Sequence, residues 1–214
     1  MLQKQTLAPA TFQLLTRLMQ DKELQMFRLV GGTALALELG HRISVDLDLF
    51  SAETFDEQAL RIYLEKNYDL QTDYISRSTV KGEIEGVQID FIAHEYRWLQ
   101  EPVVEDGIRL AGMEDLCAMK LNAIAGNGTR IKDFIDVAWL SAHYSLNYML
   151  DCYERKYDAN VLMPLKALVF FDDINLDEPV RLTDGKKVNW KQYEKRLLQM
   201  EKYPDRTFPE IVTR

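Results

Sequence analysis

Residues 45–50 (VDLDLF) alternate between apolar and acidic side chains, and this alternation constrains the fold more than any other feature of the sequence. A period of two is typical of a β-strand, in which residues i and i+2 lie on the same face. The apolar residues are expected to face a core, and Asp46 and Asp48 to project side by side. Two unpaired carboxylates this close repel each other, so one would be protonated unless a cation lay between them.

A Gly-Gly step, Gly31-Gly32, separates a short apolar segment (27–30) from a strongly helical one (33–39). Glycine lets the backbone approach an anion closely, and the free N–H groups of a helix N-terminus attract phosphate. Alone, a Gly-Gly step is most often only a turn, and an Asp-x-Asp strand is most often an exposed polar face. Together they predict a phosphate cradle beside a metal-binding pair, because a few carboxylates suit Mg²⁺ when substrate phosphates complete its shell.

Asp90 is the candidate for a third carboxylate. It lies in residues 87–92 (VQIDFI), where the alternate residues Val87, Ile89 and Phe91 are apolar, so this segment is expected to be a strand. If that strand is adjacent, Asp90 comes to lie beside Asp46 and Asp48. Two-metal phosphoryl transfer uses such a set, since one ion activates the attacking oxygen and the other steadies the triphosphate. The alternative is a solvent-exposed strand position for Asp90.

Strands and helices are mixed in the first half of the chain, whereas helices dominate the second. Strands are expected at 27–30, 45–50, 74–84, 87–92 and 107–110, with a hairpin turn at Glu85-Gly86. Helices are expected at 8–25, 33–39, 113–125, 132–143, 146–157, 160–171 and 189–202, and another opens at a capping box, 54–57 (TFDE). We therefore expect an α+β fold: a mixed β-sheet with flanking helices in residues 1–111, followed by a helical C-terminal domain in residues 112–214.

The composition excludes several classes of protein. The chain has 214 residues, 47% hydrophobic and 28% charged, which is sufficient for a core without disulfides. Its two cysteines, Cys117 and Cys152, lie in apolar helical segments and suit a reducing compartment. There is no apolar run of about 18 residues and no secretory signal pattern, so we expect a cytoplasmic protein without a membrane span. The net charge of −8 argues against broad, nonspecific binding of nucleic acid, although residues 181–214 are basic.

Residues 31–50 (GGTALALELGHRISVDLDLF) resemble the nucleotidyltransferase-like proteins of the AbiEii/AbiGii abortive-infection toxin family, within the DNA polymerase β-like superfamily. The mark of that family is a Gly-Gly or Gly-Ser turn, a spacer, and Asp-x-Asp with apolar neighbours. The resemblance continues through residues 114–124 (EDLCAMKLNAI) and 130–137 (RIKDFIDV), which is similar to the family's second block of Lys, Arg and paired Asp. It covers residues 28–140, and the C-terminal third is only loosely similar.

The resemblance implies a nucleotidyltransferase-type sheet, an NTP substrate, and Mg²⁺ or Mn²⁺ held by the three aspartates. It implies that Gly31, Gly32 and Thr33 face the triphosphate. It also implies that Lys120 contacts a phosphate from the first C-terminal helix, since Lys is a common point-charge binder of phosphate. The alternative for Lys120 is a side chain that lies along its apolar neighbours with its charge at the surface.

Arg130, Asp133 and Asp136 are further candidates for the nucleotide site. The two aspartates lie one helical turn apart and therefore share a face. They either position Lys120 or Arg130, or merely cap and solubilise their helix.

The spacer between the two glycines and the Asp-x-Asp pair contains His41, Arg42 and Ser44. The basic pair could contact substrate, but a basic pair in a loop is more often exposed to solvent, which is what we expect. Ser44 could orient Asp46 through a hydrogen bond.

The function implied is transfer of a nucleoside monophosphate from an NTP to a hydroxyl of RNA (tRNA) or protein, with pyrophosphate leaving. The resemblance adds a toxin role and a separately encoded antitoxin partner. An alternative is a catalytically inactive module that binds nucleotide or protein, but none of the three acidic residues is missing. A metal-dependent phosphodiesterase or nuclease ranks last, because it usually needs histidine ligands and His41, His94 and His143 lack ligand-like spacing.

Overall fold

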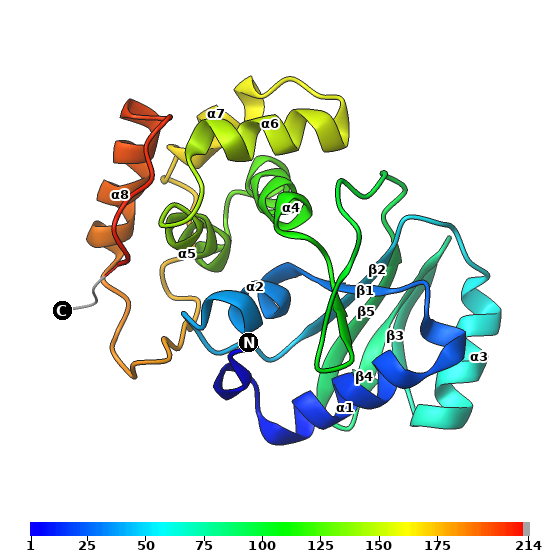
Figure 1. Ribbon diagram of the computed structural model, residues 1–214. Coiled ribbons are helices and arrows are strands. Elements are labelled where there is room, and N and C mark those ends of the chain that lie inside the picture. Colours follow the sequence, from blue (N-terminus) through cyan, green and yellow to red (C-terminus); the bar gives the residue numbers. More distant parts are fainter. Residues whose placement is uncertain (212–214) are drawn as a thin grey trace.

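The computed structural model describes residues 1–211 and contains a seven-stranded mixed sheet with the order β3-β4-β5-β2-β1-β7-β6 (Figure 1). The strands are β1 (Arg28–Val30), β2 (Leu47–Ser51), β3 (Gln71–Ser76), β4 (Thr79–Ile84), β5 (Val87–Ala93), β6 (Val103–Glu105) and β7 (Ile108–Leu110). β2 runs parallel to β5 and antiparallel to β1, and β1 runs parallel to β7. The predicted α+β class is therefore confirmed.

Helices flank the sheet in the first half of the chain and form a separate group in the second half. They are α1 (Pro9–Gln20), α2 (Gly31–Leu39), α3 (Glu57–Tyr68), α4 (Met113–Gly126), α5 (Ile131–Leu140), α6 (Leu146–Tyr157), α7 (Leu162–Leu168) and α8 (Trp190–Lys202), with short 3₁₀ turns at Lys4–Thr6 and Lys22–Leu24. α4 to α8 gather at one end of the sheet (Figure 1). Within residues 1–211, no helix combines the length and the apolar character that a membrane crossing requires.

The helix α2 connects the sheet to the C-terminal helices. Its central residues, 33–37, are all buried, and it packs against β1 and β2 on one side and α4 and α5 on the other. It ends at Gly40, which has a left-handed backbone (φ 69°) and donates its N–H to the carbonyl of Ala36. The N-terminus of α2 therefore lies where the sheet meets the C-terminal helices.

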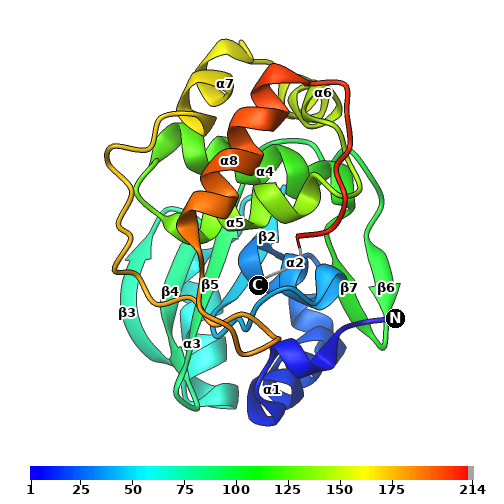
Figure 2. The ribbon, with the colours of Figure 1, turned by 90° about the vertical axis from the view of Figure 1, so that its left-hand side faces the viewer.

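The segment that joins α7 to α8 returns to the N-terminal half and runs beside the sheet toward α2 (Figure 2). The N–H of Ile43 donates to the carbonyl of Arg181 at 2.8 Å, and the backbones of Arg42 and Leu182 form an isolated antiparallel β-bridge. One apolar cluster contains residues of both halves, such as Leu35 and Phe134. The spacer before β2 is thus covered by a segment far away in the sequence.

Several predicted boundaries are wrong. Residues 74–84 form two strands rather than one, because the chain turns at Ser78 (φ 45°), where no glycine indicates a turn. The N-cap residue of α3 is Asp56 rather than Thr54, and its carboxylate accepts from two backbone N–H groups, each at 2.9 Å. Strand β6 was not expected. The turn at Glu85-Gly86 is confirmed, with positive φ at both residues.

Candidate active site

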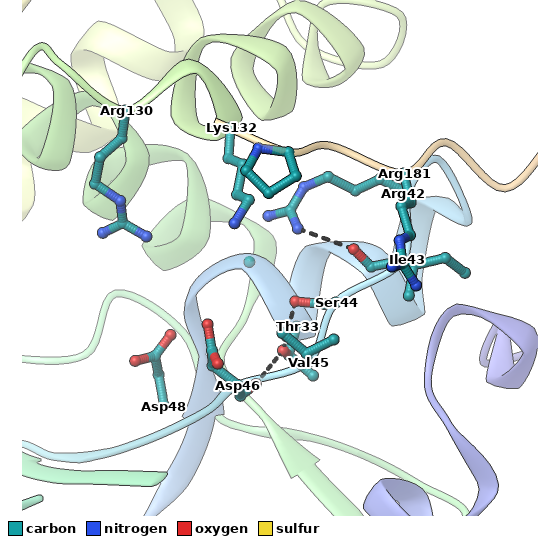
Figure 3. A pocket seen from close by; sticks show the side chains of 12 residues that line it. Thr33, Arg42, Ile43, Ser44, Val45, Asp46, Asp48, Arg130, Lys132 and Arg181 are labelled. Carbon is teal, nitrogen blue, oxygen red and sulfur yellow. Dashed lines mark hydrogen bonds between the residues drawn. The ribbon is translucent and has the colours of Figure 1, made fainter. Parts of the chain in front are cut away.

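Strand pairing brings two of the predicted acidic residues together. β2 and β5 pair Asp48 directly with Asp90, and β1 pairs Val30 with Asp48. Directly paired residues of neighbouring strands point to the same face, so the two carboxylates lie side by side. Asp46 lies just before β2 and is exposed. Figure 3 shows the side chains of Asp46 and Asp48 next to each other, both directed toward Arg130.

The protonation of Asp48 reflects this crowding. The pKa of Asp48 is raised to about 6, mostly by burial and further by the negative charges of Asp90 and Asp46, although Lys120 and Arg130 oppose the rise. A carboxyl group with this pKa lies in a place where added positive charge would be stabilising. The donor set of Asp46 and Asp48 therefore fits an oxygen-preferring divalent cation such as Mg²⁺.

Each glycine of the Gly-Gly step leaves room for a charged side chain that approaches its backbone closely. A Cβ at Gly31 would lie 2.2 Å from Oδ2 of Asp48, and Gly31 has φ +68°. A Cβ at Gly32 would lie 2.2 Å from Nη2 of Arg42. The step thus admits a carboxylate and a guanidinium to the first turn of α2, which no other residue type would allow without displacement.

Thr33 fixes the segment that carries Asp46. Its side chain is buried, and its hydroxyl donates to the backbone carbonyl of Asp46. Oγ1 of Thr33 also lies 2.8 Å from Oγ of Ser44. Ser44 is therefore linked to Asp46 through Thr33, and Thr33 holds the backbone beside the carboxylate pair.

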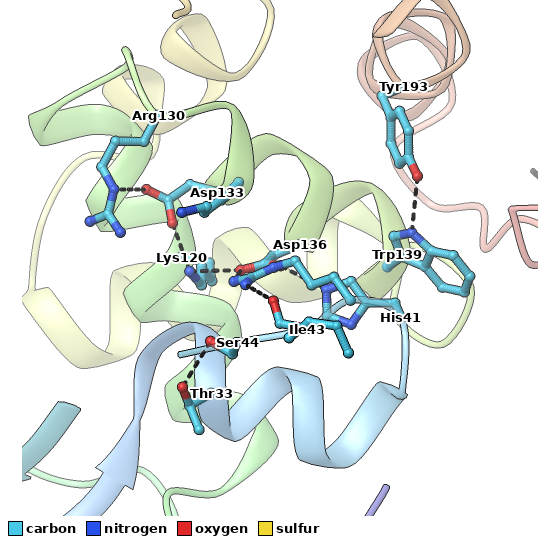
Figure 4. Close-up of polar contacts among 12 residues, drawn as sticks. Thr33, His41, Ile43, Ser44, Lys120, Arg130, Asp133, Asp136, Trp139 and Tyr193 are labelled. Carbon is cyan, nitrogen blue, oxygen red and sulfur yellow. Dashed lines mark hydrogen bonds and ion pairs between the residues drawn. The ribbon is translucent and has the colours of Figure 1, made fainter. Parts of the chain in front are cut away.

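A buried charge cluster is formed by His41, Arg42, Lys120, Asp133 and Asp136. Figure 4 shows its members His41, Lys120, Asp133 and Asp136 above α2. Nζ of Lys120 is 2.6 Å from Oδ1 of Asp133 and 2.8 Å from Oδ2 of Asp136. Arg42 donates to both carboxylate oxygens of Asp136, at 2.7 and 2.9 Å. Nε2 of His41 lies 2.7 Å from Oδ1 of Asp136. Asp136 thus contacts three nitrogen-bearing side chains.

The cluster balances its own charge. Burial alone raises the pKa of Asp136, but Arg42 and Lys120 outweigh it and hold the pKa of Asp136 well below its usual range. Burial lowers the pKa of Lys120, but Asp136 and Asp133 outweigh that effect and raise it. Burial lowers the pKa of His41 more than Asp136 raises it, so His41 is neutral near pH 7 and its Nε2–H donates to Asp136.

The expectation that His41 and Arg42 face solvent is wrong, because they are only 2% and 3% exposed. For Asp133 and Asp136 the structure favours the first of the two alternatives: both are buried, so they do not solubilise α5, and both hold Lys120. The sequence signal for this burial is the apolar context of the two aspartates in residues 131–140 (IKDFIDVAWL), since buried carboxylates need cationic partners.

A cationic pocket of about 260 Å³ opens beside the carboxylate pair (Figure 3). Four basic side chains line it, from Arg42, Arg130, Lys132 and Arg181. Arg130 is exposed, and its Nε is 3.7 Å from Oδ2 of Asp133. Lys132 is paired with Glu178 at 3.0 Å, whereas Arg181 has no ion pair among residues 1–211. The pocket is suited to a polyanion.

A second cavity, the aromatic pocket, has a volume of about 340 Å³. Its lining includes Phe50, His94, Met119, Asn122, Ala123 and Tyr157. Gly32, Asp48 and Arg130 line both pockets, so Asp48 lies at their junction. Lys120 lines the aromatic pocket from α4, but its charge is shared with the buried charge cluster. Lys132 and Asn122 lie within the two stretches that resemble the family, 130–137 and 114–124, but no site role was predicted for them, and no sequence motif indicated Arg181 or Tyr157.

Asp90 differs from the other two aspartates in its contacts. Its carboxylate forms an ion pair with Lys81, the residue that β4 places opposite it. In the described part of the chain, residues 1–211, no group of three or more His, Cys, Asp or Glu side chains is arranged as a ready-made metal site. The carboxylates available as donors are therefore Asp46 and Asp48, with Asp90 adjacent and held by Lys81.

Comparison with known proteins supplies a family. A family model described as the nucleotidyl transferase AbiEii toxin of type IV toxin–antitoxin systems matches residues 13–110 and 68–214. A protein of Aquifex aeolicus (strain VF5), described only as uncharacterized, is 32% identical over 154 residues, which are 69% of this chain and 74% of the relative.

Two crystal structures from Helicobacter pylori share the fold. One, described as a presumptive nucleotidyltransferase, superposes with a TM-score of 0.57 at 20% identity and covers 92% of this chain and 96% of that one. The other, JHP933, has a TM-score of 0.56 at 21% identity and covers 93% of each chain.

Proposed function

Because the chain belongs to the AbiEii nucleotidyltransferase toxin family, we propose that it transfers a nucleoside monophosphate from an NTP to a hydroxyl of RNA, such as tRNA, or of protein. The observation that carries this proposal is the position of Asp48 at the junction of a cationic and an aromatic pocket, beside Asp46 and Asp90. The α-phosphate of an NTP lies between the anionic β- and γ-phosphates and the nucleoside with its planar base. Carboxylates that act on the α-phosphate are therefore expected between a site for the phosphates and a site for the nucleoside.

The phosphates would lie in the cationic pocket. Gly32, at the first turn of α2, lines that pocket, and helix N-termini favour anions. Arg130 and Arg181 supply cationic groups that are exposed to a ligand. Lys120 does not line the cationic pocket, and its ammonium group is bonded to Asp133 and Asp136, so its role would be to hold α4 and α5 together beside the site.

Asp46 and Asp48 would hold Mg²⁺ or Mn²⁺, with Asp90 as the third carboxylate. The raised pKa of Asp48 supports this assignment, because it reflects a burial and repulsion that a cation relieves. When bound, the ion supplies polarisation of the α-phosphate and a lowered pKa of the attacking hydroxyl. Thr33 and Gly31 keep the carboxylates in place, the first through the backbone of Asp46 and the second through its missing Cβ.

We assign to Asp90 the role of receiving the proton of the acceptor. The acceptor oxygen forms a bond to the α-phosphorus, the bond to the bridging oxygen breaks, and pyrophosphate leaves with that electron pair. The hydroxyl proton passes to Asp90, which lies next to Asp48. Lys81 orients Asp90 through their ion pair and is a positioning residue.

The toxin role is proposed from the family, whose model describes a type IV toxin–antitoxin system. Such a role implies an antitoxin encoded separately. Modification of tRNA or of a protein essential for growth would account for toxicity, and the antitoxin would prevent or reverse its effect.

The test is transfer of label from each α-labelled NTP to tRNA or to proteins of a cell lysate, with Mg²⁺ and purified full-length protein. We expect labelled acceptor with the wild-type chain and none with Asp46→Asn or Asp48→Asn. Asp73→Asn, at an exposed position of β3, is the matched control and should retain transfer. Transfer that survives the Asp46→Ala, Asp48→Ala double substitution, or no transfer to any acceptor, would contradict the proposal.

A further inference from the structure

The aromatic pocket has a wall of rings from three separate elements. Phe50 lies on β2, His94 directly follows β5, and Tyr157 ends α6. The ring centroid of His94 is 5.7 Å from that of Phe50 and 5.6 Å from that of Tyr157. Nε2 of His94 lies 3.1 Å from the hydroxyl of Tyr157, which fixes the two rings relative to each other. The Phe50 and His94 rings are inclined by 36° and the Tyr157 ring stands at 83° to that of His94, so the set can contact both the face and the edge of a planar ligand.

Helix α4 supplies another part of the lining. Met119 and Ala123 contribute apolar surface, and Asn122 contributes an amide. Within residues 1–211 this amide makes no hydrogen bond to protein, although Asn122 is only partly exposed and lines the cavity. A side-chain amide offers both a donor and an acceptor, so it can pair with a polar edge that presents one of each.

The loop that carries His94 is held in place by contacts within the protein. Asp115 is fully buried on α4 and accepts from the backbone N–H groups of Leu99 and Gln100. Lys156 on α6 is 2.8 Å from Asp115, and its ammonium group also lies over the ring of Trp98, 4.7 Å from the centroid. The aromatic pocket is therefore preorganised, which lowers the entropic cost of binding.

Most residues that line the aromatic pocket are uncharged. The pKa of His94 is lowered to about 4, mostly by burial and further by the nearby Lys156, so the ring is neutral at pH 7. The charged residues of the lining are Asp48, Lys120, Arg130 and Asp133, which belong to the carboxylate pair, the buried charge cluster or the shared wall. A ligand in this pocket would thus be charged at the junction and neutral and planar beyond it.

We propose that the aromatic pocket binds the nucleobase of the NTP, and that Asn122 selects the base by pairing with its polar edge. This assignment rests on the proposed function and adds the residue that decides which NTP is used. The volume of about 340 Å³ is within the range of small-molecule sites, about 300–1,000 Å³. Stacking supplies affinity for every base, because each has a π-face, whereas the amide distinguishes their hydrogen-bonding edges.

The test is calorimetric titration of the full chain with ATP, GTP, CTP and UTP separately, and with inorganic tripolyphosphate, which has no base. We expect the wild-type protein to prefer one or two NTPs. Asn122→Leu should weaken the preferred NTP about tenfold, the effect of one lost hydrogen bond, and leave tripolyphosphate unchanged. Asn122→Asp, which replaces the amide donor with an acceptor, should change the order of preference. Asn67→Leu, at an exposed position of α3, is the matched control.

The outcomes separate the two proposals. If the NTPs bind but Asn122→Leu and Asn122→Asp leave their order and affinities unchanged, the base assignment is overturned and the proposed function stands. If the four NTPs bind no better than tripolyphosphate, the aromatic pocket is not a base site. If neither NTPs nor tripolyphosphate bind, the proposed function is overturned together with the base assignment. Circular dichroism of each variant ensures that a loss of binding is not a loss of folding.

Discussion

Oδ2 of Asp48 lies 2.2 Å from the point at which a Cβ of residue 31 would stand, so the carboxylate occupies the space that Gly31 leaves free. Gly31→Ala should therefore displace Asp48 and abolish nucleotide transfer. It should also lower the free energy of unfolding by about 1–3 kcal/mol, because φ at this residue is +68°. Denaturant unfolding and transfer assays measure the two effects.

Gly86→Ala provides the control for Gly31→Ala. Gly86 has a similar backbone (φ +79°), but nothing lies within 4 Å of its added Cβ. This variant should lose stability through strain alone and keep its transfer activity. If Gly31→Ala were as active as Gly86→Ala, the contact with Asp48 would have no functional role.

The raised pKa of Asp48 predicts a pH dependence of stability in the absence of metal. Its folded-state pKa of about 6 exceeds the ordinary value of 3.8, so the folded chain binds this proton more tightly than the unfolded chain. Stability should therefore fall as the pH rises from about 4 to about 6, by about 2–3 kcal/mol in total. Asp48→Asn should remove this loss and be more stable than the wild-type protein at pH 8.

Chemical unfolding in EDTA at pH 4.5 and pH 8 measures this difference. Added Mg²⁺ should stabilise the wild-type chain at pH 8, where Asp48 is ionised, and should leave Asp48→Asn unchanged. A wild-type chain that gains as much from Mg²⁺ at pH 4.5 as at pH 8 would show that Asp48 is not a ligand.

Local patterns in the sequence were sufficient to predict the strands that carry Asp48 and Asp90. The alternation around Asp48 and Asp90 predicted two strands, since a half-buried strand needs a period of two. That these two strands are adjacent was only a hypothesis, because β2 and β5 are separated by two further strands, α3 and a turn. That turn, at Ser78, has no glycine and could not be found from composition.

The buried charge cluster could not be predicted in full, because its members come from segments far apart. Asp136 bonds His41 and Arg42, which lie 95 and 94 positions earlier in the chain. Local sequence describes those two residues only as a basic pair in a loop. Their burial depends on how α5 packs on α2, and on the need of a buried carboxylate for cationic partners. The aromatic pocket, built from β2, α4, α6 and the loop after β5, is unpredictable for the same reason.

Asp136→Asn should destabilise the chain strongly. The substitution keeps the shape but leaves Arg42 and Lys120 buried with one carboxylate instead of two. Removing one partner of a buried ion pair costs about 3–5 kcal/mol. Glu95→Gln, which removes the exposed partner of Arg77, should cost no more than about 1 kcal/mol. Equal unfolding free energies for the two variants would contradict the structural role of the cluster.

Lys81 should control the pH at which the enzyme becomes active. Its ammonium group is paired with Asp90, whose negative charge is one cause of the raised pKa of Asp48. Lys81→Met leaves that charge uncompensated, so the pKa of Asp48 should rise further above 6. The acidic limb of the transfer rate, measured against pH at low Mg²⁺, should then move to higher pH, whereas Lys66→Met on the exposed face of α3 should not move it. Saturating Mg²⁺ should reduce the displacement, because a bound cation offsets the same repulsion that Lys81 offsets. If the acidic limb stayed at the same pH and only the maximal transfer rate fell, Lys81 would instead have a role in binding the acceptor.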